Sequence, residues 1–314
     1  MSIGRRWKGL VGATGLAVVL ALAFGGGDGH AQTEVFLWST PVSLGPLINS
    51  EYNEEMPHLS QDGLSLYFIS NRTPGAPGDF DIWVSHRVNG SWRRPRKLGR
   101  NINTSFNERG PCLSPDGHYL FFSSDRTDLA GSHGSHDLWV SYRDDVSDDG
   151  GWQVPVNLGP AVNTADLDFG AALLGDPNGN LSALLFGRRV GGGQADIYMS
   201  RYVHASFQLA TPVTELNSPS DDLRPTIRPD GLELFFNSNR PDSILNDIWV
   251  STRPSLSSPW STPTNLGPPI NTEFQEQFPA VSADGRMLIF SSNRDGTDSV
   301  LYVSTRRPII HYWP

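Results

Sequence analysis

Carboxylates and arginines recur at fixed places along this chain, and such groups can do acid–base or ligand-binding chemistry. An acidic residue stands three positions before a recurring proline or its equivalent, at Glu54, Glu108, Asp168, Asp222 and Glu276. An arginine follows it in each copy, at Arg72, Arg126, Arg189, Arg240 and Arg294. A further aspartate recurs at Asp81, Asp137, Asp196 and Asp247. Two free carboxyl groups about 5 to 9 Å apart would suit glycoside hydrolysis, whereas carboxylates held by arginines would be structural ion pairs.

These residues belong to a unit that repeats five times with a period of about fifty residues, which is typical of stacked or circular modules. Its shared features are a Pro, an Asp-Gly turn, an aromatic run, Asp-Ile-Trp-Val-Ser, and Leu-Gly-x-x-Ile-Asn. The copies lie near 53–103, 107–163, 167–217, 221–271 and 275–306.

The second copy shows how one unit is built. Residues 110–114 and 119–123 predict two strands joined by the tight turn Pro115-Asp116-Gly117, in which glycine supplies a positive φ. Residues 137–141 predict a third strand and 152–155 an outer one, where proline is tolerated. Four antiparallel strands with this spacing make one propeller blade. The fold is therefore predicted to be all-β, a five-bladed β-propeller of four-stranded blades.

The two ends of the chain are out of phase with the blades. Residues 36–49 contain an outer-strand motif without the three strands that should precede it, and the last copy stops after its third strand. We expect this N-terminal strand to complete the last blade and close the ring, which removes the free sheet edges.

The repeat resembles the TolB-like WD40-like family, called PD40 after its Pro-Asp turn, in the exported variety. The resemblance covers nearly all of the mature chain and rests on Ser-Pro-Asp-Gly at 114–117 and Arg-Pro-Asp-Gly at 228–231. It implies an interaction platform rather than a particular activity. The third copy departs from the pattern, with Ala171 in place of the proline, and the fifth has Val300 in place of the aspartate.

Strand direction places the acidic residues, the arginines and the recurring aspartates on one face, around the mouth of the central channel. One interpretation is that they form blade-to-blade ion pairs, since arginine matches a carboxylate bidentately. The other is that the ten residues at 54, 72, 108, 126, 168, 189, 222, 240, 276 and 294 bind a ligand. A catalytic site would break the fivefold symmetry, and the third blade is the place to search for its pocket.

Residues 1–31 predict a secretory signal peptide, with basic Arg5, Arg6 and Lys8 before an apolar stretch and Gly29-His30-Ala31 at the cleavage site. We expect residues 32–314 to form the propeller and to be exported to the periplasm or secreted. We also expect the mature chain to have no membrane span and to be a monomer. The net charge of −9 argues against nucleic acid as a partner.

Other candidate groups are weaker. His133 and His136 could supply two metal ligands, but no third ligand is assignable, so we expect no metal site and no cofactor. Cys112, the only cysteine, predicts a buried apolar position. The sequence therefore favours an exported binding scaffold whose partner is an envelope or extracellular protein, or a glycan. The alternative is a glycan-active hydrolase that uses rim carboxylates on the same face.

Overall fold

The computed structural model describes residues 22–23, 33–34, 36–72, 80–176, 179–296 and 298–308. The predicted signal peptide lies outside them, except for a two-residue strand, β1 (Leu22–Ala23), which pairs with β2 (Thr33–Glu34). The described elements are β-strands and one short 3-10 turn, η1 (Val190–Gly192). No helix in this part of the chain is long and apolar enough to cross a membrane.

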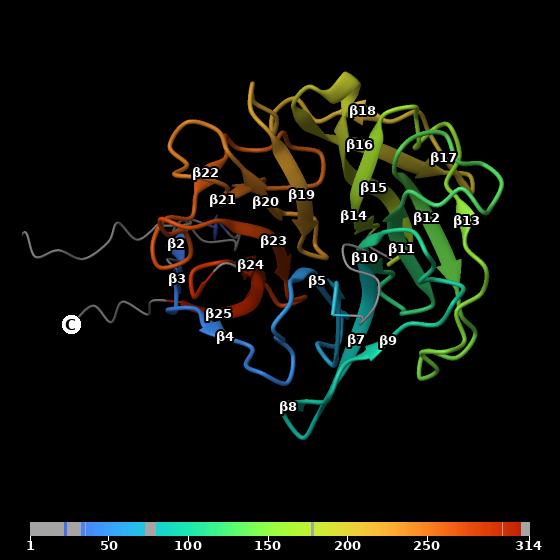
Figure 1. The fold of residues 1–314 in the computed structure, drawn as a ribbon. Helices are drawn as coiled ribbons and strands as arrows, with labels where there is room; N and C mark the ends of the chain where they lie inside the picture. The colour runs from blue at the N-terminus through green and yellow to red at the C-terminus, as the bar shows by residue number, and fades with distance from the viewer. Residues whose placement is uncertain are drawn as a thin grey trace, which may run out of the picture.

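Five antiparallel sheets surround a central axis, and the innermost strands of neighbouring sheets contact one another around the whole ring (Figure 1). The first blade contains β5 (Glu54–Leu59), β6 (Ser65–Ser70), β7 (Asp81–Val88), β8 (Ser91–Trp92) and β9 (Arg96–Lys97). The second contains β10 (Glu108–Leu113), β11 (Tyr119–Ser124), β12 (Asp137–Tyr142) and β13 (Val156–Asn157). The third contains β14 (Leu167–Gly175), β15 (Leu181–Arg189), β16 (Ala195–Val203), β17 (Ser206–Phe207) and β18 (Thr211–Pro212).

The remaining two blades complete the ring. The fourth contains β19 (Asp222–Ile227), β20 (Glu233–Ser238), β21 (Asp247–Thr252) and β22 (Thr264–Asn265). The fifth contains β23 (Glu276–Val281), β24 (Met287–Ser292), β25 (Val300–Pro308), β3 (Phe36–Trp38) and β4 (Val42–Ser43). The predicted five-bladed β-propeller is thus confirmed.

The N-terminal segment closes the fifth blade as predicted. Strand β3 pairs antiparallel with β25, with Trp38 opposite Arg306, and β4 continues the pairing with Ser43 opposite Tyr302. The first and last described parts of the propeller therefore share one sheet, and the outer edge of β25 is covered.

An asparagine in the segment between consecutive blades both accepts and donates hydrogen bonds and thereby fixes this linker in place. Asn103 Oδ1 accepts the Ile82 N–H at 2.7 Å, and its Nδ2 donates to the Ile82 and Leu98 carbonyls at 2.9 and 3.0 Å. Equivalent hooks are made by Asn49, Asn163, Asn217 and Asn271. The recurring Ile-Asn thus ties each linker to the third strand of the blade that it leaves.

Each innermost strand carries a β-bulge two residues after its buried carboxylate, where φ is positive. The register shifts at this point in all five blades. The residues with positive φ are Met56, Gly110, Gly170, Arg224 and Phe278. Left-handed backbone suits glycine but costs about 1–2 kcal/mol for other residues. In three blades a residue other than glycine occupies this strained backbone, and the side chains of these three residues surround the channel.

Candidate ligand cavity in the central channel

The five predicted rim carboxylates are buried inside the blades rather than displayed at the mouth. Each has an exposed fraction of 0% and accepts hydrogen bonds from the first residue after the linker asparagine. In the first blade, Glu54 accepts from the Ser50 N–H and hydroxyl at 2.7 and 2.6 Å. The same arrangement recurs at Glu108, Asp168, Asp222 and Glu276. These carboxylates therefore anchor each linker to the blade that it enters.

Four of the five carboxylates are paired with an arginine. Glu54 lies 2.9 Å from Arg72, Glu276 lies 3.0 Å from Arg294, and Asp222 pairs with Arg240. The prediction of blade-to-blade pairs is wrong for these, because both partners belong to one blade. The guanidinium still links two blades, since Arg72 also donates to the Ile48 carbonyl in the preceding linker.

In the third blade, the predicted partner is wrong by one residue. Asp168 pairs with Arg188 at 2.6 Å, whereas Arg189 lies 3.1 Å from Asp221 in the next blade. Successive strand residues point to opposite faces of a sheet, so adjacent arginines at the end of β15 serve different partners. Whether the ten ring residues contact a ligand stays a prediction.

Glu108 is the rim carboxylate without an arginine. Arg126 turns to Asp128, with nitrogen–oxygen distances of 3.0 and 3.1 Å. Burial raises the pKa of Glu108 to about 7, against hydrogen bonds from Thr104 and Ser124 that lower it. A raised carboxyl pKa is one mark of a general acid, but this side chain has no exposed surface from which to reach a substrate.

Three of the four recurring aspartates of the third strands also have structural partners, whereas burial and the nearby Asp222 and Asp221 raise the pKa of the fourth, Asp196. Asp81 lies 2.6 Å from Lys97, while Asp137 and Asp247 accept from Asn157 and Asn265 of the outer strands at 2.9 and 2.7 Å. The structure does not group His133 and His136 with a third ligand: no set of three His, Cys, Asp or Glu suited to a metal occurs among the described residues.

A cavity of about 450 Å³ occupies the central channel and is lined by all five innermost strands. It extends from the bulge residues to the Asp-Gly turns, where Gln61 and Pro229 are exposed, so it opens on the turn face. This face is opposite to the predicted rim. Most of its wall is apolar, including Leu59, Leu113 and Val281.

Arg224 forms the inner end of this cavity. Gly110 and Gly170 leave room for it: an added Cβ would lie 2.9 Å from Arg224 Nη1 and 2.7 Å from its Cδ, respectively. The side chain thus crosses in front of the second and third blades, and its Nη1 lies 3.0 Å from the sulfur of Met56 in the first.

Two aromatic rings flank the Arg224 guanidinium, Phe169 at 4.6 Å and Phe278 at 5.3 Å from its central carbon. Phe169 itself lies over Gly187, where an added Cβ would lie 2.7 Å from the ring. The third repeat, which departs from the pattern, therefore supplies space for the Arg224 side chain at Gly170 and an aromatic ring beside it at Phe169.

No carboxylate oxygen of the described residues lies within 4 Å of the Arg224 guanidinium. Burial, helped by repulsion from Arg109 and opposed by attraction to Glu55, lowers the pKa of Arg224 to about 9, so it remains a cation at neutral pH. Burial also raises the pKa of Glu55, despite attraction to Arg109 and Arg224. The cavity therefore ends in an arginine without a direct ion pair.

His58 provides a second polar group in the wall. Its Nε2 accepts the Leu113 N–H at 3.0 Å, and burial lowers its pKa to about 4. The ring is therefore neutral near pH 7, and its proton resides on Nδ1.

In four blades, the residue after the bulge is a proline without an N–H, whereas Ala171 keeps this donor in the third.

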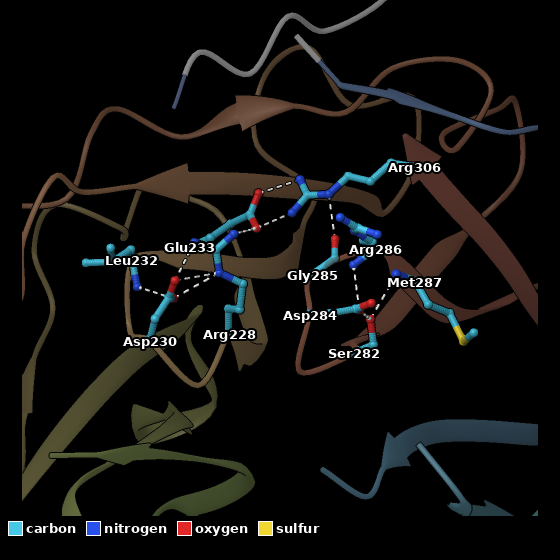
Figure 2. Close-up of polar contacts among 10 residues, drawn as sticks. All are labelled: Arg228, Asp230, Leu232, Glu233, Ser282, Asp284, Gly285, Arg286, Met287 and Arg306. Carbon is cyan, nitrogen blue, oxygen red and sulfur yellow. Dashed lines mark hydrogen bonds and ion pairs between the residues drawn. The ribbon is translucent and has the colours of Figure 1, made fainter. Parts of the chain in front are cut away.

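A buried network beside the turn face joins the fourth and fifth blades (Figure 2). Arg306 of β25 contacts both oxygens of Glu233 at 2.6 and 2.5 Å and donates from Nε to the Gly285 carbonyl at 2.5 Å. Arg228 lies 3.3 Å from the same carboxylate and also pairs with Asp230. This is a true blade-to-blade ion pair, and the repeat did not predict it.

The repeat pattern did not indicate the cavity residues, because it singles out the positions that are the same in every copy. The column two positions after each rim carboxylate is irregular and reads Met56, Gly110, Gly170, Arg224 and Phe278. Variation in an otherwise regular unit is the signal that could have identified it.

Comparisons with solved structures agree on the fold. The chain is similar to native Bacillus subtilis arabinanase Arb43A, with 13% identity, a TM-score of 0.56, and coverage of 85% of this chain and 97% of that one. It is also similar to a thermostable family-43 glycoside hydrolase, with 12% identity, a TM-score of 0.55, and coverage of 86% and 94%. TolB from Acinetobacter baumannii matches at 17% identity, with a TM-score of 0.47 and coverage of 83% and 56%.

No protein-family model matches the chain, and no curated protein matches it in sequence. The similarities to the two glycoside hydrolases therefore support the β-propeller fold alone. They do not confirm membership of the PD40 family.

Proposed function

We propose that this chain is an exported binding module that receives an apolar ligand segment in its central cavity, through the turn face. The observation that carries the proposal is the cavity of about 450 Å³, which is a common size for a ligand site. It is mostly apolar, has a few polar groups at defined places, and is built by all five blades.

Its lining favours a protein segment over a neutral glycan. Most of the wall is apolar, with proline, alanine and leucine as its commonest side chains, whereas sugar hydroxyls need many hydrogen-bonding partners. The resemblance to TolB-like repeats, which act mainly as interaction platforms, supports a protein partner in the cell envelope or outside the cell.

The hydrolase alternative has less support from the site. Its mechanism needs two accessible carboxyl groups on either side of a glycosidic bond. The five rim carboxylates are fully buried, and four of them are neutralised by arginine. Structural similarity to glycoside hydrolases concerns the fold alone.

The proposal is tested by placing a bulky side chain at the cavity entrance. Ala283 lies in a turn that lines the cavity, so Ala283→Trp should block ligand entry. Ser257→Trp, in an exposed loop of the fourth blade, is the matched control. The wild type and both variants are screened by thermal shift against apolar peptides, arabinan, xylan and peptidoglycan fragments, with release of reducing sugar measured in parallel.

Peptide-induced stabilisation in the wild type and the control, lost in Ala283→Trp, is the expected result. Release of reducing sugar, or binding that Ala283→Trp leaves unchanged, would contradict the proposal.

A further inference from the structure

The cation at the inner end of the cavity has no structural task that explains it. Arg224 is half-buried and has no direct ion pair, which is costly because the part of its charge that leaves water gains no matching partner. Arg224 also occupies left-handed backbone, with φ of 55°, where two other blades have glycine. The chain thus accepts both electrostatic and backbone strain at this one position, and such strain is concentrated at functional sites.

The surroundings hold the guanidinium in place, and Glu55 attracts it without a direct ion pair. Phe169 and Phe278 flank it, and Met56 offers only a thioether sulfur, which is a weak acceptor. Its direct contacts with these side chains are cation–π contacts and one contact with sulfur, which leave N–H donors available for a ligand. Arg224 is among the residues that line the cavity.

We propose that the ligand of this cavity carries a carboxylate on an apolar body, and that the carboxylate binds Arg224 at the inner end. A carboxylate matches the planar fork of a guanidinium. One cation at the inner end suits a singly charged group better than a phosphate dianion, which needs more donors. The two carboxylates of the lining, Asp176 and Asp230, lie in turns at the open end, where Asp230 pairs with Arg228. The inference rests on the proposed function and names the chemistry of its ligand.

Neighbouring groups fit the same ligand. Neutral His58 carries a proton on Nδ1, and Ala171 supplies the backbone N–H that proline removes in the other four blades. Both residues line the cavity. Neither residue is negatively charged, and most of the wall around them is apolar.

Two sources of this chemistry are possible, a free organic acid and the carboxyl end of a peptide. The experiment uses 3-phenylpropionate with its primary amide, and an apolar tripeptide with a free carboxyl end together with its amidated form. Dissociation constants are measured by titration calorimetry for the wild type, Arg224→Met, Arg201→Met and Ala283→Trp. Arg201 is exposed on the third strand of the third blade and is the matched arginine control.

At least one acid should bind the wild type and Arg201→Met at least tenfold more tightly than its amide, which is about 1.4 kcal/mol. Arg224→Met should bind acid and amide alike. Preference for the phenylpropionate identifies a small organic acid, and preference for the tripeptide identifies a peptide end. Failure of both acids to bind, or an acid preference that survives in Arg224→Met, would overturn the inference.

The proposed function fails separately from this inference. If acids and amides bind equally well and Ala283→Trp abolishes both, the cavity is a binding site but Arg224 does not select a carboxylate. A stability measurement provides a further check: because Arg224→Met removes an unpaired buried cation, the ligand-free variant should melt at or above the wild-type temperature. A large fall in melting temperature would indicate a structural arginine and contradict the inference.

Discussion

Single residues in this propeller differ in protonation because each blade satisfies its buried carboxylate differently. Glu54 is held by Arg72, whereas Glu108 has only neutral donors, because Arg126 pairs with Asp128. A buried carboxyl group without a cation favours its neutral form. The same repeat position therefore holds an ion pair in one blade and a group that titrates near neutral pH in the next.

Stability should fall as Glu108 ionises. Its folded-state pKa of about 7 lies above the ordinary glutamate value of 4.5. The folded state therefore binds this proton more tightly, and the stabilisation present below pH 4.5 is lost as the pH rises through 7. The shift corresponds to a penalty of about 3 kcal/mol above pH 7. Glu108→Gln mimics the neutral form and should be more stable than the wild type at pH 8, but not at pH 4.

Urea denaturation of both proteins between pH 4 and pH 8 measures this difference. Glu54→Gln is the matched control, since it removes the anion that pairs with Arg72 and should destabilise the protein at neutral pH. Parallel pH profiles for the wild type and Glu108→Gln would contradict the assignment.

At the scale of the elements, each linker is held by hydrogen bonds to both of the blades that it connects. Each linker bonds backward through its asparagine and forward through its Ser or Thr, which donates to the next buried carboxylate. The Leu-Gly-x-x-Ile-Asn motif is thus a joint between sheets, and its repetition reflects packing rather than ligand binding.

Removal of one asparagine hook should weaken the joint between two blades. Asn103→Ala leaves the buried Ile82 N–H without its acceptor and removes one of the two donors to the Ile82 carbonyl, which should cost about 1–3 kcal/mol. Asn103→Asp keeps the acceptor for the Ile82 N–H but loses the hydrogen bonds that Nδ2 donates to the Ile82 and Leu98 carbonyls. Hydrogen exchange of the Ile82 amide should accelerate more in Asn103→Ala than in Asn103→Asp. Equal exchange rates in the two variants would argue against the hook.

The elements were more predictable from the sequence than the site was. Prolines, Asp-Gly turns and aromatic runs identified the strands because local turn chemistry and alternation determine them. The pairing of Asp168 with Arg188 depends on which way each side chain points at a strand end, and no repeat encodes it. The bulge likewise turns Met56, Arg224 and Phe278 into the channel, although nothing in their sequence neighbourhood indicates positive φ.

At the scale of the whole molecule, closure of the ring depends on the junction beside the N-terminal strand. Arg306 lies on β25, which pairs with β3, and its guanidinium reaches Glu233 in the fourth blade. Its central carbon also lies 4.9 Å from the ring of Trp38 on β3. One side chain therefore connects the fourth blade, the fifth blade and the closing strand.

Loss of this arginine should destabilise the entire propeller. Arg306→Met leaves Glu233, which has no exposed surface, with Arg228 alone at 3.3 Å, and breaking such a buried pair costs about 3–5 kcal/mol. Arg307→Met changes the neighbouring exposed residue and should alter stability by less than about 0.5 kcal/mol. Urea unfolding followed by tryptophan fluorescence compares them. In the double variant Arg306→Met with Glu233→Gln, the loss should be smaller than the sum of the single losses, because no unpaired carboxylate remains. Additive losses would show that the two residues act independently and that ring closure does not depend on their pairing.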